Sequence, residues 1–298
     1  GMGKELSENY REVKEVFELA NESLGIDIKD ICFNGPEEEL IKTENTQPAI
    51  LTTSIAILKI LESKGIKADV TAGLSLGEYS SLVYSGALKF EEAVKLVKKR
   101  GKYMQEAVPE GVGTMAAVLG LGKEDILEVI NEASEFGAIE AANYNCPGQI
   151  VLSGEVKAIE ASIEISKEKG AKRAIILPVS APFHCSLLEP AGEKLKEALK
   201  EVSIGNLNVK TVSNVTADYI DSEESIKELL IKQVSSSVLW EDSIELMLKD
   251  GIDTFIEIGP AKTLIAFVKK IAKNNKIDVN CFNVEDIDSL NKLISSFE

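Results

Sequence analysis

The sequence predicts an α/β protein: a mostly parallel sheet flanked by helices, with a smaller unit inserted into it. Runs of β-favouring residues alternate with helical segments in the first and last thirds of the chain, the pattern of a parallel sheet covered by helices. In between, the order of elements changes to β-α-β-β-α-β. With 298 residues, 44% of them hydrophobic, the chain is long enough to bury a substantial core.

Residues 111–180 are interpreted as the inserted unit. Its expected strands and helices are, in order, Thr114–Leu119, Lys123–Ser134, Ala138–Asn145, Gln149–Ser153, Val156–Lys169 and Lys172–Val179. This order is typical of a ferredoxin-like subdomain, which closes its own four-stranded antiparallel sheet. Residues 1–110 and 181–298 would then form the main α/β core.

The core elements are expected on both sides of this insert. The predicted helices are Glu8–Leu24, Ala49–Leu61 opened by Pro48, Phe90–Gln105, Glu189–Val202, two that begin near Ser225 and Glu241, Lys262–Ala272 and one after Asp286; the predicted strands are Lys67–Ala72, Val209–Asn214, Thr254–Ile258 and Val279–Asn283.

A Gly-x-Ser-x-Gly pattern lies between the strand that ends at Ala72 and the next helix. A strand that turns sharply into a helix presents its serine, here Ser75, from a strained backbone, and the next backbone N–H, that of Leu76, faces an oxyanion formed there. This context predicts a nucleophile on an α/β-hydrolase-like core, although Gly and Ser also fill ordinary turns.

Composition excludes several classes of partner. The net charge of −16 argues against nucleic acid and anionic membrane surfaces. No apolar run reaches the roughly 18 residues that span a bilayer, and no signal peptide is evident, so a cytoplasmic protein is expected. The four cysteines are far apart, without the paired spacing of a zinc site or a disulfide framework, and are expected to be reduced.

His184 is the one histidine in the chain. It follows Ala181, Pro182 and Phe183 at the exit of the inserted unit, so it is expected at the seam between two bodies, where clefts form. A lone histidine is more often structural than catalytic. Here the position beside a seam, with a candidate nucleophile upstream, favours the general base that a serine hydroxyl requires.

Several stretches resemble the malonyl-CoA:acyl-carrier-protein transacylases of bacterial fatty-acid synthesis, over essentially the whole chain. They are Thr46-Gln47-Pro48-Ala49, Gly73-Leu74-Ser75-Leu76-Gly77-Glu78-Tyr79, Arg100-Gly101-Lys102-Tyr103-Met104-Gln105, Asn145-Cys146-Pro147-Gly148-Gln149, Pro178-Val179-Ser180-Ala181-Pro182-Phe183-His184, Ser213-Asn214-Val215-Thr216 and Glu257-Ile258-Gly259-Pro260.

The resemblance implies a role for each site residue. Ser75 would carry the malonyl group as an ester, with His184 as general base and then general acid. Arg100 would hold the free malonyl carboxylate in a bidentate pair, which guanidinium forms better than lysine. Gln233 corresponds to the carbonyl acceptor that orients the histidine, through either its main chain or its side chain. Phe183 resembles the residue that limits acyl size in malonyl-selective members.

Two departures from the family pattern stand out. Leu74 takes the place of a histidine that often precedes the nucleophile, which should leave the chemistry unchanged. The family also opens with a strand and a Gly-Gln-Gly-x-Gln loop whose N–H completes the oxyanion hole, whereas this sequence starts at residues that follow that loop. Leu76 N–H is then the one hole donor that the sequence identifies.

The resemblance implies malonyl transfer from malonyl-CoA to the phosphopantetheine thiol of acyl carrier protein by a ping-pong route, with no metal or redox cofactor. Because such carriers are typically acidic, a local basic surface is expected near the cleft, such as lysines around Arg100 or on the helix near residue 270. Two alternatives remain: a Gly-x-Ser-x-Gly esterase or thioesterase, and an impaired carrier-binding acyltransferase without the opening loop.

Overall fold

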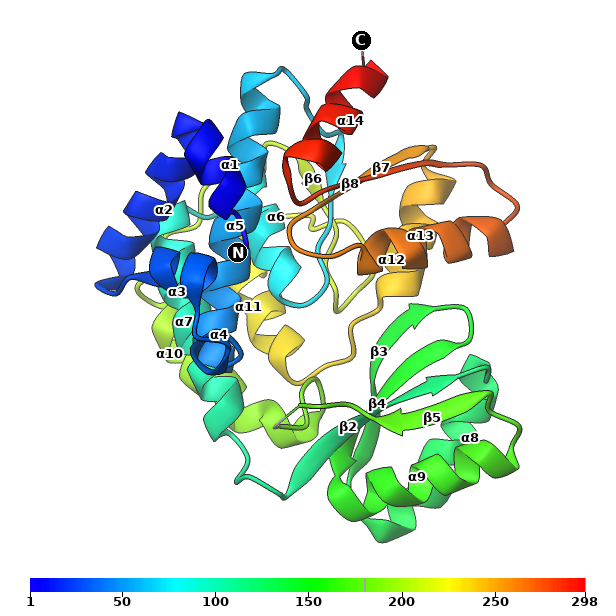
Figure 1. The fold of residues 1–298 in the computed structure, drawn as a ribbon. Helices are drawn as coiled ribbons and strands as arrows, with labels where there is room; N and C mark the ends of the chain where they lie inside the picture. Colours follow the sequence, from blue (N-terminus) through cyan, green and yellow to red (C-terminus); the bar gives the residue numbers. More distant parts are fainter. Residues whose placement is uncertain (180, 298) are drawn as a thin grey trace.

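The computed structural model describes residues 1–179 and 181–297, so Ser180 in the motif before His184, and Glu298, lie outside the described residues. The fold is mixed α/β, with many helices and small sheets. Figure 1 shows a helical body at one side, two short parallel strand pairs beside it, and a separate four-stranded unit below.

Five helices form the N-terminal part: α1 Lys4–Asn9, α2 Arg11–Leu24, α3 Ile28–Asn34, α4 Glu37–Leu40 and α5 Thr43–Ser63. The helix predicted over Glu8–Leu24 is divided, because Tyr10 has an extended backbone with φ of −126°. The expectation that Pro48 opens the next helix is wrong. Pro48 lies inside α5, which begins at Thr43, and its missing N–H removes one bond near the start of a helix whose packing outweighs that loss.

The strands of the core run parallel, as predicted, but they form two separate pairs instead of one continuous sheet. β1 Val70–Thr71 pairs with β6 Lys210–Thr211, and β7 Thr254–Ile258 pairs with β8 Asn280–Val284. The remaining core helices are α6 Leu76–Ser85, α7 Phe90–Glu106, α10 Glu189–Leu199, α11 Glu223–Val234, α12 Trp240–Lys249, α13 Thr263–Asn274 and α14 Ile287–Phe297.

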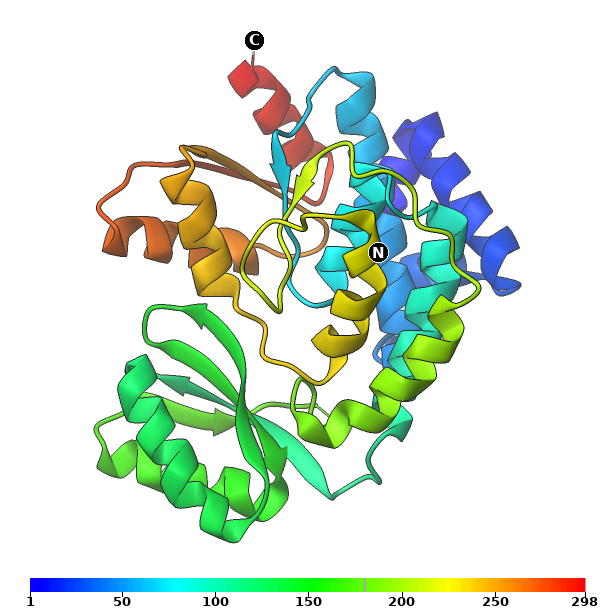
Figure 2. The ribbon, with the colours of Figure 1, turned by 180° about the vertical axis from the view of Figure 1, so that it is seen from behind.

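The four-stranded unit follows the predicted order of elements. Its strands are β2 Gly113–Leu119, β3 Ile139–Cys146, β4 Gln149–Glu155 and β5 Arg173–Ile176; its helices are α8 Lys123–Ala133 and α9 Val156–Glu168. The sheet is antiparallel throughout, with strand order β3-β4-β2-β5. Both helices cover the same face of the sheet, as the reverse view in Figure 2 also shows. A separate hydrophobic cluster lies between these helices and the sheet.

The opposite face of this sheet carries a small cluster of Met115, Ala117, Ala142 and Val151, against which Phe183 packs. The chain segments entering and leaving the unit touch each other: a Cβ placed on Gly113 would lie 2.4 Å from the Pro182 ring. The segment that enters the unit and the segment that leaves it are therefore packed together, and His184 follows directly on the second of them.

The long helix α5 occupies the centre of the helical body. Its side chains from Leu51 to Leu61 are largely buried, and it packs against α2 and α7. Its apolar character therefore reflects burial within the protein. Within residues 1–179 and 181–297, no helix is both long and apolar enough to cross a membrane.

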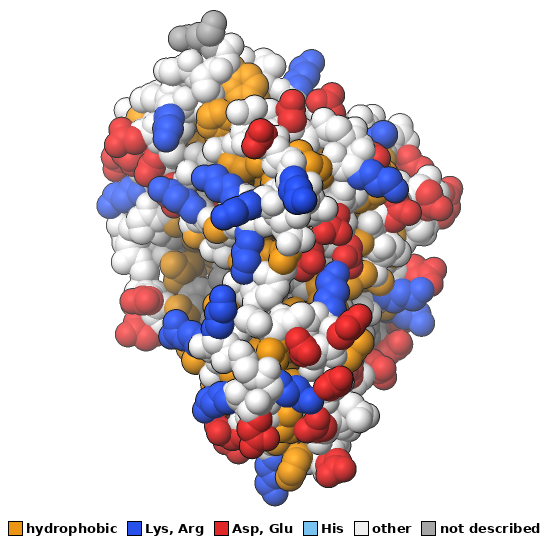
Figure 3. All heavy atoms as spheres, turned by 90° about the vertical axis from the view of Figure 1, so that its right-hand side faces the viewer, with side chains coloured by type: hydrophobic (Ala, Val, Ile, Leu, Met, Phe, Trp, Pro, Cys, Tyr) orange, Lys and Arg blue, Asp and Glu red, His pale blue; other side chains and the backbone are white. Residues whose placement is uncertain are grey.

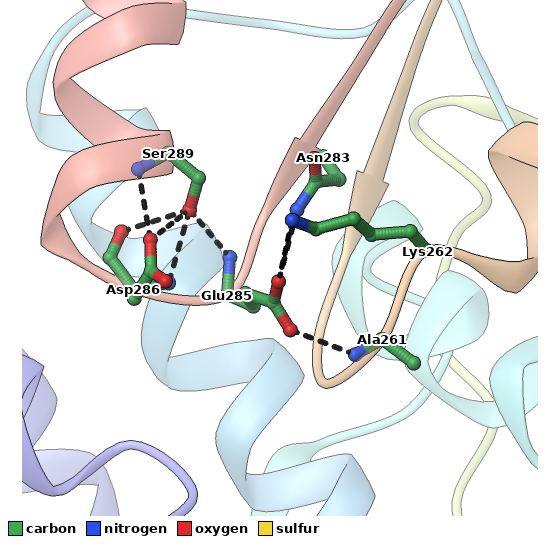
Figure 4. A network of polar contacts seen from close by, with 6 residues as sticks. All are labelled: Ala261, Lys262, Asn283, Glu285, Asp286 and Ser289. Atoms are coloured by element: carbon green, nitrogen blue, oxygen red, sulfur yellow. Dashed lines mark hydrogen bonds and ion pairs between the residues drawn. The ribbon is translucent and has the colours of Figure 1, made fainter.

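A loop between β7 and α13 is tied to the C-terminal segment (Figure 4). Ala261 N–H donates to Glu285 Oε2 over 3.0 Å, and Lys262 Nζ lies 3.2 Å from Glu285 Oε1. Beyond Glu285, Ser289 N–H donates to Asp286 Oδ1 at the start of α14. Ala261 itself has φ of 85°, a conformation that favours glycine, so the loop is held at a cost in backbone strain.

Replacing Ala261 with glycine removes this strain. We expect Ala261→Gly to raise the free energy of unfolding by about 1 kcal/mol, because the relief of a left-handed conformation exceeds the added chain entropy. The measurement is urea denaturation of the purified protein. The matched control is Ala266→Gly, at an exposed position inside α13, which should lose about 1 kcal/mol. Equal losses for both variants would contradict the strain at Ala261.

Candidate active site

Ser75 lies in the turn between β1 and α6, as the Gly-x-Ser-x-Gly pattern predicts. Its backbone has φ of 53° and ψ of −103°, a strained conformation for a residue with a side chain. The turn is tight because Gly73 approaches Gly77 closely: a Cβ on Gly73 would lie 2.0 Å from the Gly77 carbonyl carbon. A Cβ on Gly77 would meet no atom within 4 Å, so the two glycines of the motif are not equivalent.

Asn214 fixes this turn from the segment after β6. Its Oδ1 accepts the Ser75 N–H over 2.6 Å, and its Nδ2 donates to the Gly73 carbonyl over 2.7 Å. The Ser75 N–H is therefore already bonded. The N–H of Leu76 is at the first position of α6, where a helix offers no internal acceptor, and so this donor remains for an oxyanion.

His184 contacts Ser75 directly. Its Nε2 is 2.7 Å from Ser75 Oγ, and its Nδ1 is 2.9 Å from the main-chain carbonyl oxygen of Gln233. A carbonyl oxygen only accepts, so Nδ1 carries the proton and, in the neutral ring, Nε2 accepts from the serine hydroxyl. Burial, reinforced by the charge of Arg100, lowers the pKa of His184 to about 4, so the ring is a neutral base at pH 7.

Arg100 is 1% exposed although it lies on the lysine-rich helix α7. Its Nη1 donates to Gln47 Oε1 over 2.7 Å, and its Nη2 donates to both Ser75 Oγ and Gln233 Oε1 over 3.0 Å. Its Nε is buried and has no hydrogen-bond partner among the described residues. Burial lowers the pKa of Arg100, and a guanidinium with an unused donor suits an anionic ligand.

Gln233, on α11, makes contacts with both its main chain and its side chain. The main-chain carbonyl, one of the two acceptors that the sequence allows, accepts from His184 Nδ1 over 2.9 Å. The side-chain Nε2 donates to the Ser75 carbonyl over 2.9 Å and to Glu78 Oε2 over 2.6 Å, while Oε1 accepts from Arg100. One residue thus joins the Ser75 turn, the imidazole and the guanidinium.

Phe183 is half-buried beside this group. It packs against the main core and also against the small cluster on the sheet of the four-stranded unit. The structure therefore brings together Ser75, His184, Arg100 and Gln233 by direct contact, with Leu76 and Phe183 adjacent to them in the chain. In the described part of the chain, no three or more His, Cys, Asp and Glu side chains are grouped so that they could hold a metal ion.

Three further residues of the sequence motifs contact the site, although sequence reasoning predicts no role for them: Gln47, Glu78 and Asn214. Each is buried, and each makes a hydrogen bond to a site residue or to the turn around Ser75. A polar side chain inside an apolar segment, such as Gln47 before Pro48, is the signal that could have found them, since buried polar groups need specific partners.

The different space around Gly73 and Gly77 can be tested by a matched pair of alanine variants. We expect Gly73→Ala to lower the free energy of unfolding by about 3 kcal/mol, because its methyl group must displace backbone. Gly77→Ala should be neutral or stabilise by up to about 1 kcal/mol, since alanine favours the first turn of a helix. Urea denaturation of both variants measures the free energy of unfolding. Similar losses of stability at the two positions would show that the close approach of Gly73 to Gly77 does not restrict the turn.

Comparison with known proteins places the chain in a family. The acyl transferase domain family matches residues 1–291. The malonyl CoA-acyl carrier protein transacylase of Bacillus subtilis is 50% identical over 277 residues, covering 93% of this chain and 87% of the relative. A crystal structure of the transacylase of that name from Clostridium perfringens superposes with a TM-score of 0.96 at 55% identity, covering 100% of this chain and 92% of that one. A second structure, of a malonyl-transacylase in complex with a type II polyketide acyl-carrier protein, has a TM-score of 0.95 at 38% identity and covers 99% and 95%. The chain therefore belongs to the acyl transferase domain family, and the family predicted from its motifs is confirmed.

Proposed function

We propose that this protein transfers a malonyl group from malonyl-CoA to the phosphopantetheine thiol of acyl carrier protein, through an acyl-enzyme on Ser75. The relatives and the structural neighbours carry the name of that activity. The single observation that carries the proposal is that Ser75 Oγ is shared by a neutral imidazole, 2.7 Å away, and a buried guanidinium, 3.0 Å away.

The first half-reaction follows from this arrangement. His184 Nε2 takes the hydroxyl proton as Ser75 Oγ bonds to the thioester carbonyl carbon, and the Leu76 N–H stabilises the oxyanion. The carbon–sulfur bond then breaks, and the imidazolium returns its proton to the departing coenzyme A thiolate. In the second half-reaction the carrier thiol loses its proton to His184, its sulfur attacks the ester carbon, and Ser75 leaves as a hydroxyl.

Arg100 would bind the free carboxylate of the acyl group. Its Nε–H has no acceptor in the described protein, and its Nη2 bonds only to neutral oxygens, so a carboxylate could form a bidentate charge-assisted pair across one edge. Binding there would draw Nη2 away from Ser75 Oγ at the moment when the serine must react. Phe183, between the two bodies, would limit the size of the acyl group.

We propose that the fold is an α/β-hydrolase-like core, residues 1–110 and 181–298, with a ferredoxin-like subdomain over residues 111–180. The strand order β3-β4-β2-β5 with two helices on one face supports the second assignment. The nucleophile would come from the core and the base from the segment that leaves the subdomain. We propose that the reaction uses no metal or redox cofactor and takes place in the cytoplasm.

The carrier protein would dock on a basic part of an otherwise acidic molecule. Figure 3 shows Lys and Arg side chains gathered across the middle of the face that lies on the right in Figure 1. Four lysines are exposed in α13 or just after it: Lys269, Lys270, Lys273 and Lys276. They would attract an acidic carrier against the net charge of −16, and this contact would weaken as salt screens it.

Intact-mass measurement after addition of malonyl-CoA tests the function. The wild-type protein should gain one malonyl group and pass it to carrier protein. Ser75→Ala should gain none, and His184→Ala should be acylated about 10²–10⁴-fold more slowly. At saturating malonyl-CoA the wild-type rate should begin to fall once the pH drops below about 5, because His184 accepts a proton only when neutral and its pKa is about 4. An adduct on Ser75→Ala would move the nucleophile elsewhere, and release of free malonate without carrier would indicate a thioesterase.

Arg100→Ala tests the carboxylate site. We expect malonyl transfer to lose about 3–5 kcal/mol in transition-state stabilisation, because an anion in a buried site loses its charged partner. Acetyl transfer should be spared, since an acetyl group has no carboxylate. The comparison is kcat/KM for malonyl-CoA and acetyl-CoA in the same preparation, with Arg100→Lys as a variant that keeps the charge but not the bidentate geometry. Equal losses for both thioesters would exclude this role.

A further inference from the structure

Glu78 is a carboxyl group with no exposed surface in the first turn of α6, three residues after Ser75. Acidic residues in the first turn of a helix are usually solvated, where they meet the positive end of the helix dipole. Glu78 instead points inward. Its Oε2 accepts from Gln233 Nε2 over 2.6 Å and from the Asn214 N–H over 3.2 Å, and its Oε1 has no hydrogen-bond partner among the described residues.

Arg100 lacks a direct ionic partner. No carboxylate in the described residues lies within 4 Å of its nitrogens, and its three hydrogen bonds go to neutral oxygens of Gln47, Ser75 and Gln233. A buried charge without any counter-charge is strongly destabilising. Glu78 is the carboxyl group whose charge acts on Arg100, from the far side of the Gln233 carboxamide.

The Gln233 carboxamide transmits this interaction in one orientation. Its NH₂ group faces two acceptors, the Glu78 carboxyl and the Ser75 carbonyl, while its oxygen faces a guanidinium, which only donates. A carboxylate on one side and a guanidinium on the other therefore polarise the amide in the same direction. Arg100 is stabilised without losing its place for an acyl carboxylate, which a direct salt bridge would occupy.

We propose that Glu78 is a positioning residue that supplies the counter-charge of Arg100 through Gln233, and that its ionisation weakens the preference of the site for a carboxylated acyl group. The inference rests on the proposed function and concerns the same site. With Glu78 ionised, the Arg100–Glu78 group is neutral before the acyl carboxylate arrives. With Glu78 neutral, the group is cationic and attracts that carboxylate more strongly.

The pH dependence of this effect has a definite sign. Burial raises the pKa of Glu78 to about 7, opposed by the hydrogen bonds from Gln233 and Asn214 and by the charge of Arg100. The other titratable groups around it are Tyr79, with a pKa raised to about 12, His184, with a pKa lowered to about 4, and Arg100, a guanidinium that stays charged. Between pH 6 and 8 Glu78 is the member of this group that titrates, so preference for malonyl should be greater at pH 6 and smaller at pH 8.

The experiment compares kcat/KM for acylation of Ser75 by malonyl-CoA and by acetyl-CoA at pH 6, 7 and 8. Both thioesters carry the same coenzyme A and use the same serine and histidine, so their shared titrations cancel in the ratio. In the wild type the malonyl-to-acetyl ratio should fall about tenfold from pH 6 to pH 8, the order expected for a charge several ångströms away in a protein interior. In Glu78→Gln, which keeps an acceptor oxygen, the ratio should stay high and level.

The matched control is Glu241→Gln, which removes another buried carboxyl of raised pKa, on α12 and paired with Lys123. In this variant the malonyl-to-acetyl ratio of kcat/KM should fall from pH 6 to pH 8, as in the wild type. A level ratio in the wild type would overturn the proposal whether or not Glu78→Gln folds, and so would a persistent fall in Glu78→Gln. Failure of the wild type to form any malonyl adduct would instead refute the proposed function.

Discussion

Burial of the Arg100 guanidinium determines which polar side chains gather around Ser75. Removing this charge from water is costly, and the protein meets the cost with carboxamide and hydroxyl oxygens placed around it. Those oxygens belong to α5, to the turn before α6 and to α11, so the charge draws together segments far apart in the chain. Burial of the imidazole, together with the charge of Arg100, lowers the pKa of His184, so the protonation of this histidine responds to the guanidinium.

Ser75 and His184 are both held by strained backbone. Ser75 has φ of 53° and His184 has φ of 59°, so each of the two side chains projects from a conformation that residues with a Cβ avoid. The strain is maintained by contacts that leave little freedom: Asn214 bonds both sides of the Ser75 turn, and the Gln233 carbonyl fixes the imidazole. A hydrogen bond of 2.7 Å between the pair results before any substrate binds.

Local patterns predicted the elements well, and relations between distant segments less well. The turn at Ser75 and the β-α-β-β-α-β order of elements follow from residue order, because glycine placement and periodicity act locally. The inward direction of the Glu78 side chain and the partners of Gln47 cannot be predicted from the sequence, since they depend on which helices pack together. The position of Pro48 inside α5 differs from the prediction for the same reason: packing of α5 against α2 and α7 outweighs the local preference of proline for a helix start.

The contact between Gly113 and Pro182 couples the orientation of the four-stranded unit to the base. Pro182 is two residues before His184, so this contact fixes the start of the short segment that carries the imidazole. The distance of 2.7 Å between His184 Nε2 and Ser75 Oγ therefore depends on packing between the four-stranded unit and the chain that leaves it, as well as on the contacts around Ser75 itself.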